Sequence, residues 1–212
     1  MLWLGDSGMG KSHAQRAFLE EAKARHGMIV VAHDDTKLEP EVPGAIRANV
    51  ADLEARPPSE EEDATGALCF RGDAFRGIVV EVEEVAAFAI DRLARRRVRT
   101  CMVVEELDRA VTPGGRQLVS AKLRECCTQG RVLGLCVSST TQSPARTPAE
   151  ILDQATAVVL FRLGPRALNY VDERLMFDGE LLAAVPTLER GDFVLHVPGE
   201  PWNRTLYRFP PS

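Results

Sequence analysis

The chain has 212 residues, 45% of them hydrophobic and 27% charged, with a formal net charge of −5 at pH 7. This composition is typical of a soluble globular protein, and we expect a single domain over residues 1–212. No apolar run approaches the roughly 20 residues that span a bilayer, and the apolar start is too short for a signal peptide, which argues against an integral membrane segment and against secretion.

Predicted strands and helices alternate along the chain. Residues 1–4 are apolar and predict a first strand, a helix follows from Ser12 to about Arg25, and MIVVA at 28–32 predicts a second strand. Residues 36–65 are rich in proline and acidic residues and predict an exposed loop. The later predicted elements are a strand at 67–70, a helix from Glu83 to about Arg97, a strand at 100–105, a helix at 116–129, strands at 132–138 and 157–161, and a hairpin within 191–209 whose strands, 192–197 and 205–209, are joined by PGEPWN. This alternation predicts an α/β fold with a mainly parallel sheet covered by helices on both faces.

The first predicted turn carries a phosphate-binding motif. Its residues are Gly5, Asp6, Ser7, Gly8, Met9, Gly10, Lys11 and Ser12, which match G-x-x-x-x-G-K-[ST] in full. The glycines let backbone N–H groups wrap the phosphates, Lys11 brings charge to the β- and γ-phosphates, and Ser12 offers a hydroxyl to Mg²⁺. Because the motif lies between a predicted strand and a predicted helix, we interpret it as an ATP site rather than an ordinary glycine turn.

A second motif, MVVEE at 102–106, is an apolar strand that ends in two acids. Such a strand places Glu105 near Mg²⁺ and Glu106 near the γ-phosphate, where its carboxylate can polarise a water molecule for in-line attack. Glu105 stands where an Asp is usual, so its metal contact is expected to be longer or water-mediated. The pair favours hydrolysis over transfer to a small molecule, although a charged strand end is the simpler alternative.

A third motif, GLCVSSTTQ at 134–142, is a buried strand that opens into polar residues. Its last residue, Gln142, is able to sense the γ-phosphate. The motif is weak alone, because polar residues after a strand are usually only a loop.

Together the three motifs resemble the FtsK/HerA superfamily of ring-forming, DNA-pumping ATPases. The match continues through the R-x-x-G segment at 131–134, TQSP at 141–144, PAEILDQATAVVLFRL at 148–163 and LERGDFVL at 188–195. The resemblance implies a RecA-like P-loop fold, ATP and Mg²⁺, a homo-oligomeric ring of five or six subunits, and ATP-driven movement of double-stranded DNA. It also implies that Arg131 reaches the γ-phosphate of a neighbouring subunit, with Arg116, Arg124 and Arg146 as alternatives and a surface arginine as the simplest interpretation.

The sequence shows none of the membrane segments, barrel or DNA-reading tail that cellular members usually carry. A motor of this kind resembles the genome-packaging ATPases of membrane-containing icosahedral viruses, and we expect it in the host cytoplasm or at the packaging vertex of a virion, with capsid-vertex or viral membrane proteins as partners. A cellular or plasmid DNA translocase is the alternative. A small-molecule kinase and a nucleotide-switched binding module are more remote.

A basic run at Arg92, Arg95, Arg96, Arg97 and Arg99 offers a candidate contact for DNA phosphates. The net negative charge makes such local patches the expected source of any DNA contact. A solvated helix end, stabilised by the helix dipole, is the more ordinary explanation.

Overall fold

The computed structural model describes the chain apart from residues 35–45, 49–66, 72–77, 111–118, 199–206 and 209–212. The chain divides into two compact units. The first contains Met1–Gln15, Glu106–Gln117 and Ser139–Ser212, and the second contains Arg16–Glu105 and Leu118–Ser138. The assignment of one domain to residues 1–212 stays a prediction.

The first unit is built around β1, a short and fully buried strand. Its strands are β1 (Leu2–Leu4), the last part of β6 (Leu135–Thr141), β7 (Val158–Leu160), β8 (Asp192–His196) and β9 (Tyr207–Arg208), in the order β6-β1-β7-β8-β9. β1 pairs in parallel with β6 and with β7, whereas β8 is antiparallel to β7 and to β9. The predicted C-terminal hairpin is therefore present, while its connecting residues 199–206 lie outside the described residues.

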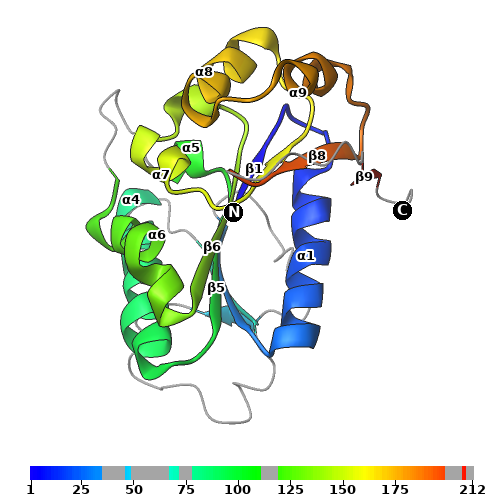
Figure 1. Ribbon diagram of the computed structural model, residues 1–212. Coiled ribbons are helices and arrows are strands. Elements are labelled where there is room, and N and C mark those ends of the chain that lie inside the picture. Colours follow the sequence, from blue (N-terminus) through cyan, green and yellow to red (C-terminus); the bar gives the residue numbers. More distant parts are fainter. Residues whose placement is uncertain (35–45, 49–66, 72–77, 111–118, 199–206, 209–212) are drawn as a thin grey trace. The chain divides into compact units, whose positions relative to one another are not determined.

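The helices of the first unit are mostly short. They are α5 (Leu107–Ala110), α7 (Ala149–Asp153), α8 (Pro165–Leu175) and α9 (Gly179–Ala184), with 3-10 turns at Pro144–Arg146 and Val185–Thr187 (Figure 1). The sequence analysis predicted no helix in these segments. With four to six residues in three of them, no helical periodicity can build up.

The second unit is a parallel sheet with helices. Its strands are β2 (Ile29–Asp34), β3 (Ile46–Ala48), β4 (Ala67–Arg71), β5 (Thr100–Val104) and the first part of β6, in the order β3-β4-β2-β5-β6. Its helices are most of α1 (Lys11–His26), α4 (Ile78–Ala87), a π-helix at Phe88–Leu93, a 3-10 turn at Ala94–Arg96 and α6 (Ala121–Leu133). β2 pairs in parallel with β4 and with β5, as the alternation of elements predicted.

Helices cover the sheet of the second unit on both faces (Figure 1). On one face Leu19 of α1 packs in a buried cluster with Val30 and Ala32 of β2 and with Cys101 and Val103 of β5. On the other face α4 and α6 lie side by side, and the Cys126 thiol of α6 donates to the Ala86 carbonyl of α4 at 3.5 Å. The predicted α/β class, with helices on both faces of a mainly parallel sheet, is confirmed.

Two predicted boundaries were wrong because of local capping. The helix predicted at 116–129 begins at Ala121, where the Ser120 hydroxyl accepts the Leu123 N–H at 3.0 Å, and it continues to Leu133. Gly134 ends it with φ of 77°, so the strand predicted from residue 132 begins at Leu135. The helix predicted from Glu83 begins five residues earlier, at Ile78. Most of the loop predicted at 36–65 lies outside the described residues, but Ile46–Ala48 within it form the strand β3.

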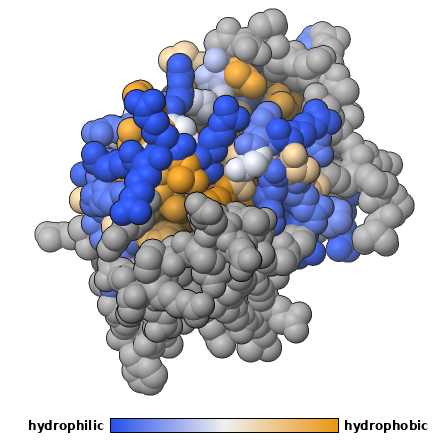
Figure 2. All heavy atoms as spheres, turned by 90° about the horizontal axis from the view of Figure 1, so that it is seen from below, coloured by the Kyte–Doolittle hydropathy of each residue, from blue (hydrophilic) through white to orange (hydrophobic). Residues whose placement is uncertain are grey.

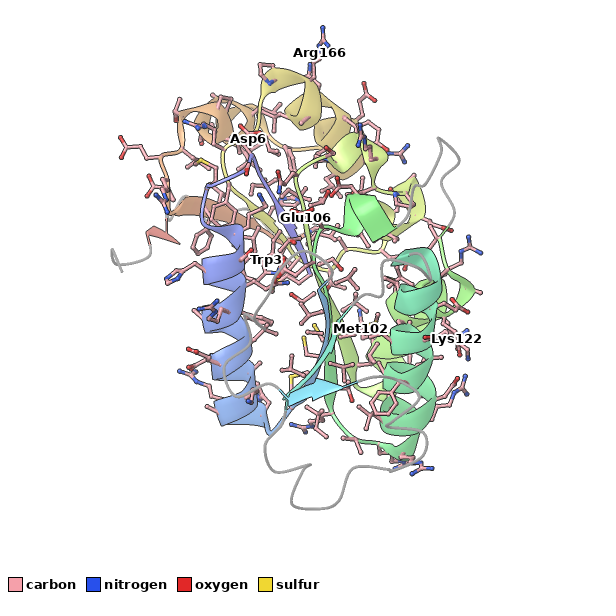
Figure 3. The ribbon with its side chains drawn as sticks, turned by 180° about the vertical axis from the view of Figure 1, so that it is seen from behind. Trp3, Asp6, Met102, Glu106, Lys122 and Arg166 are labelled. Carbon is pink, nitrogen blue, oxygen red and sulfur yellow. The ribbon has the colours of Figure 1, made fainter. Side chains whose placement is uncertain are left out.

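Charged side chains cover much of the surface of the second unit. Arg95 forms ion pairs with Asp91 and Glu125, and Lys122 contacts the same two carboxylates at 2.7 and 3.1 Å. Lys122 lies on the outer side of α6 (Figure 3), and the coloured part of the face in Figure 2 is largely hydrophilic around a smaller hydrophobic area. Among the described residues no helix is both long and apolar enough to cross a membrane.

Candidate nucleotide-binding site

The loop Gly5–Ser12 joins β1 to α1 and turns sharply at two glycines. Gly8 and Gly10 have φ of +75° and +99°, which L side chains rarely adopt. The Lys11 side chain, only 7% exposed, curls back over the loop, and its ammonium donates to the carbonyls of Gly5 at 2.7 Å and Asp6 at 2.8 Å. This is a compact loop with a cation held over its own backbone, the arrangement that a phosphate-binding loop requires.

The loop leads directly into a helix N-terminus. α1 begins at Lys11, its first turn contains no acidic residue, and Ala14 N–H bonds to the Gly10 carbonyl at 3.0 Å. The positive end of the helix dipole therefore faces the loop without an acidic residue in that turn to neutralise it.

Neighbouring backbone holds the loop on both sides. A Cβ at Gly5 would lie 2.6 Å from the Cβ of Phe161, the residue after β7. Only glycine therefore fits at this position unless Phe161 moves away. Gly191, in the turn before β8, donates its N–H to the Met9 carbonyl at 3.0 Å, and Asp6 N–H bonds to the Arg162 carbonyl at 2.9 Å. The buried Met9 side chain completes the packing, so the conformation of the loop is set by tertiary contacts as well as by its glycines.

Glu106 has an unusual backbone. Its φ is 47°, in the left-handed region, which a non-glycine residue occupies at a cost of about 1–2 kcal/mol. The Glu106 N–H donates to the Thr140 hydroxyl at 3.0 Å, and the Gln142 amide donates to Glu106 Oε1 at 3.0 Å. Thr140 of β6 therefore holds the Glu106 backbone, and Gln142, the residue after β6, holds its carboxylate.

A second, buried set of hydrogen bonds supports the same region. The Thr141 hydroxyl donates to Asp108 Oδ1 at 2.9 Å and accepts the Ser143 N–H at 3.2 Å, and the Thr147 hydroxyl lies 3.5 Å from it. Thr141, Thr147 and Asp108 are all buried. The segment that carries Gln142 is therefore anchored to the start of α5, immediately after Glu106.

Strand pairing brings these groups to one edge of the first unit. β1 and β6 run parallel with Leu2 opposite Ser139 and Leu4 opposite Thr141, so the loop and Gln142 both follow the carboxyl ends of adjacent strands. Glu106 is bonded to Thr140, which lies opposite Trp3 of β1. Figure 3 labels Trp3 on β1, Asp6 beyond its end, and Glu106. The predicted residues Glu106 and Gln142 therefore lie at the edge from which the phosphate loop departs.

Two other predicted site residues belong to the second unit. Glu105, 7% exposed, directly follows β5, and Arg131 is an exposed residue in the last turn of α6. Of the alternatives to Arg131, Arg124 and Arg146 are exposed and Arg116 lies outside the described residues. The approach of Glu105 to Mg²⁺ and of Arg131 to a neighbouring nucleotide stays a prediction.

The residues at the loop fit the phosphates of ATP. Backbone turned by two left-handed glycines, a buried ammonium and a helix N-terminus without acidic residues form a donor set for an anion. Ser12, in the first turn of α1, would offer its hydroxyl to Mg²⁺, which would offset phosphate charge. Among the described residues no group of three or more His, Cys, Asp or Glu side chains could hold a metal, but Mg²⁺ at such a site needs few protein ligands and keeps several waters.

The sequence analysis missed the role of Thr140. The signal was present, since the run SSTT at 138–141 places hydroxyls inside a buried strand, where each needs a hydrogen-bond partner. Which hydroxyl faces Glu106 depends on strand register, which sequence alone does not determine.

Comparison with solved structures identifies the fold. The genome-packaging NTPase B204 of Sulfolobus turreted icosahedral virus 2, solved with AMPPCP, aligns with a TM-score of 0.72 and 15% identity over 100% of this chain and 96% of that chain. The fold is that of such P-loop NTPase structures. VirB4 of Thermoanaerobacter pseudethanolicus gives a TM-score of 0.72 at 13% identity over 100% and 89% of the two chains, and the plasmid coupling protein TrwB, solved with GDPNP, gives 0.63 at 13% over 99% and 84%.

At these identities the likeness establishes the fold alone. Neither a family model nor a curated protein matches the sequence. The resemblance that the three motifs predicted is confirmed for the P-loop ATPase fold.

Proposed function

We propose that the chain is an ATPase that converts ATP and water to ADP and phosphate and uses the free energy to translocate double-stranded DNA. The observation that carries this proposal is Glu106, whose left-handed backbone donates its N–H to Thr140 and whose carboxylate accepts from Gln142, at the edge where the phosphate loop begins. A strained backbone with oriented side-chain contacts is typical of functional positions.

In this proposal each group has a separate task. Gly5–Ser12 and the N-terminus of α1 bind the phosphates, with Lys11 at the β- and γ-phosphates. Glu106 takes a proton from the attacking water, and Gln142 positions the carboxylate and senses the γ-phosphate. Mg²⁺, held by Ser12 and Glu105, would reduce the charge on the phosphates during cleavage.

A positioned base favours water as the acceptor, and this separates the proposal from its rivals. A small-molecule kinase has another acceptor and does not need Glu106 as a base for water. A nucleotide-switched binding module would hydrolyse slowly and would not respond to DNA.

The movement of DNA is proposed from the solved neighbours. B204 is described as a genome-packaging NTPase and TrwB as a conjugative or plasmid coupling protein. We propose packaging of a viral genome into a preformed capsid as the biological role, with one ATPase domain per chain, a ring of five or six subunits, and Arg131 acting on the neighbour's nucleotide. Capsid-vertex or viral membrane proteins are the proposed partners.

A cellular or plasmid translocase is the alternative. Conjugation genes beside the gene for this chain would favour it.

The test is ATP turnover by the purified chain with and without linear double-stranded DNA. We expect DNA to raise the rate and the motor to displace a third strand annealed at the end of the duplex. Glu106→Gln should lower both activities by about 10²-fold or more, whereas substitution of the exposed Glu173 on α8 by Gln should retain them. Slow turnover without a DNA response would support the binding module, and phosphoryl transfer to a small molecule would support the kinase.

A further inference from the structure

Arg162 lies beside the phosphate loop, in the segment 148–163, and no role of its own was predicted for it from the sequence. It follows β7, which pairs in parallel with β1 so that Leu160 lies opposite Leu4, and it therefore leaves the sheet at the same edge as the loop. Its carbonyl accepts the Asp6 N–H at 2.9 Å, and a Cβ at Gly5 would lie 3.5 Å from the same oxygen. The backbone of Arg162 is thus fixed against the second residue of the loop.

The side chain of Arg162 is held only weakly. Its Nε lies 4.0 Å from Asp6 Oδ2, at the outer limit of an ion pair, and the two side chains are 50% and 45% exposed. Pairs this exposed contribute little, because both charges remain hydrated. The guanidinium can therefore leave Asp6 at small cost, and its planar fork of donors suits phosphate oxygens.

Asp6 connects the two cations of this region. Its carbonyl accepts a hydrogen bond from the Lys11 ammonium at 2.8 Å, while its carboxylate faces Arg162. Arg162 is therefore adjacent to the residue that holds the lysine assigned to the β- and γ-phosphates. The geometry places a second, more exposed positive charge beside the same residue of the loop.

We propose that Arg162 is a second phosphate-binding cation of the nucleotide site, which exchanges its contact with Asp6 for the β- or γ-phosphate of ATP bound to its own subunit. The proposal rests on the assignment of Gly5–Ser12 as the ATP site. It differs from the role proposed for Arg131, which acts on a neighbouring subunit.

The test measures binding of AMPPNP and of AMP to the full chain in the presence of Mg²⁺. We expect Arg162→Ala to weaken AMPPNP binding by about 10- to 100-fold, the range for hydrogen bonds to charged groups, and to change AMP binding less than threefold. The matched control is Arg166→Ala, an exposed arginine on α8 (Figure 3), which should bind both nucleotides as the unmodified chain does. Unchanged AMPPNP affinity in Arg162→Ala, or equal losses for AMPPNP and AMP, would overturn the proposal.

A double variant separates phosphate binding from masking of the Asp6 charge. Asp6→Asn keeps the backbone N–H and carbonyl that contact Arg162 and Lys11 but removes the negative charge. If Arg162 only masks that charge, Arg162→Ala should have no effect in the Asp6→Asn background, and the proposal is wrong. If Arg162 binds phosphate, the loss persists there.

Failure of this inference can be told from failure of the proposed function. Lys11→Ala tests the ATP site itself, so normal AMPPNP binding by that variant would remove the site and the inference together. Lost binding in Lys11→Ala with normal binding in Arg162→Ala would remove the inference alone. Melting temperatures of each variant establish that the chain is folded.

Discussion

The two units differ in how many polar side chains they bury beside their apolar cores. In the second unit the cluster around Leu19 is apolar, with Val30, Ala32, Cys101 and Val103 from adjacent strands. The described part of the first unit also has an apolar core, in which Leu4, Leu160 and Phe161 are fully buried. It buries nine polar and charged side chains besides, namely Lys11, Gln15, Asp108, Ser139, Thr140, Thr141, Thr147, Asp192 and His196, against four in the described part of the second unit, namely Thr100, Glu105, Ser120 and Ser138. β6 contributes to both, since Leu135–Ser138 belong to the second unit and its hydroxyl-bearing end belongs to the first.

This difference indicates a division of labour. Burial of apolar surface is non-directional and stabilises the fold, whereas a buried polar group is tolerated only with a partner in a defined position. The hydrogen bonds of Thr140 and Thr141 therefore place Glu106 and Gln142, and the apolar cluster supplies stability. Substitutions of the polar residues around Glu106 should change chemistry more than stability, and substitutions in the apolar cluster around Leu19 should do the reverse.

The largest expected effect is the loss of nucleotide binding in Lys11→Ala. The phosphates would lose their fixed cation, and turnover should become undetectable while the melting temperature changes little. Calorimetric titration with ATP and a melting curve measure both quantities. Ordinary nucleotide affinity in this variant would contradict the assignment of the loop.

Arg131→Ala tests whether a residue of the second unit can take part in catalysis. Arg131 lies in that unit, and we propose that it acts on the nucleotide of a neighbouring subunit. We expect normal ATP binding and a loss of turnover of about 10³-fold, since arginines acting from a neighbouring subunit supply about 10³–10⁵ in rate in well-studied GTPases. Arg124→Ala, on the same helix, should keep its activity, and a loss there instead would move the role to Arg124.

Mixing two inactive variants tests whether Arg131 acts between subunits. Assemblies of Arg131→Ala with Glu106→Gln should recover part of the activity, because the first chain supplies the base and the second supplies the arginine. Native mass spectrometry establishes that both chains are present. No recovery in such mixed assemblies would count against action between subunits.

For Glu106→Gln we expect ATP binding to remain while hydrolysis falls by about 10²-fold or more, as for removal of a general base. The amide keeps the size of the side chain and the bond to Thr140 is made by the backbone, so stability should be unchanged. Single-turnover rates with radiolabelled ATP measure the chemical step. Near-normal turnover would assign the base elsewhere, with Glu105 as the first candidate.

Leu19→Ala tests the apolar cluster. Leu19 is 2% exposed, and its loss should cost about 2 kcal/mol in free energy of unfolding, at the low end for such changes because the partly buried Phe18 and Met28 can relax into the space. Urea unfolding gives this value, and ATP titration should show an unchanged dissociation constant. A large loss of ATP affinity with little change in stability would break the division between the two units.

The smallest expected effect concerns His196 on β8. Both of its ring nitrogens are buried without a hydrogen-bond partner among the described residues, and its ring meets Phe177 edge-on at 4.9 Å between centroids. Burial lowers the pKa of His196 from its usual value of 6.5, and the charge of Asp178 only partly opposes this. The unfolded chain therefore binds the proton more readily, and stability should fall as the pH falls below about 6.5.

His196→Leu removes that proton-linked loss. We expect the variant to be more stable by about 1 kcal/mol, because two unsatisfied nitrogens leave the interior, and to lose less stability between pH 7 and pH 5 than the unmodified chain. Urea unfolding at both pH values measures the difference. Identical pH dependence of the two proteins would show that His196 is not the responsible group.

The sequence by itself determined the features that depend on local order along the chain. The spacing of Gly5, Gly8, Gly10 and Lys11 predicts a phosphate-binding loop because the donors are neighbouring backbone groups, and alternating apolar segments predict the α/β class. Capping at Ser120 and Gly134 is equally local. The predicted boundaries of α6 were wrong because these cap residues, and not the hydrophobic pattern, determine where the helix begins and ends.

Only the tertiary structure decided which distant residues meet. Glu106 and Gln142 are 36 positions apart, and they meet because the end of β6 lies against Glu106, whose N–H donates to Thr140 of that strand. Arg162 reaches Asp6 because β7 pairs with β1 in parallel, and the left-handed backbone of Glu106 is sustained by contacts that include the Thr140 hydroxyl. A sequence pattern records the period of burial along one strand, but the register between strands arises from the packing of all of them together, because a shift of one residue would turn every side chain to the opposite face.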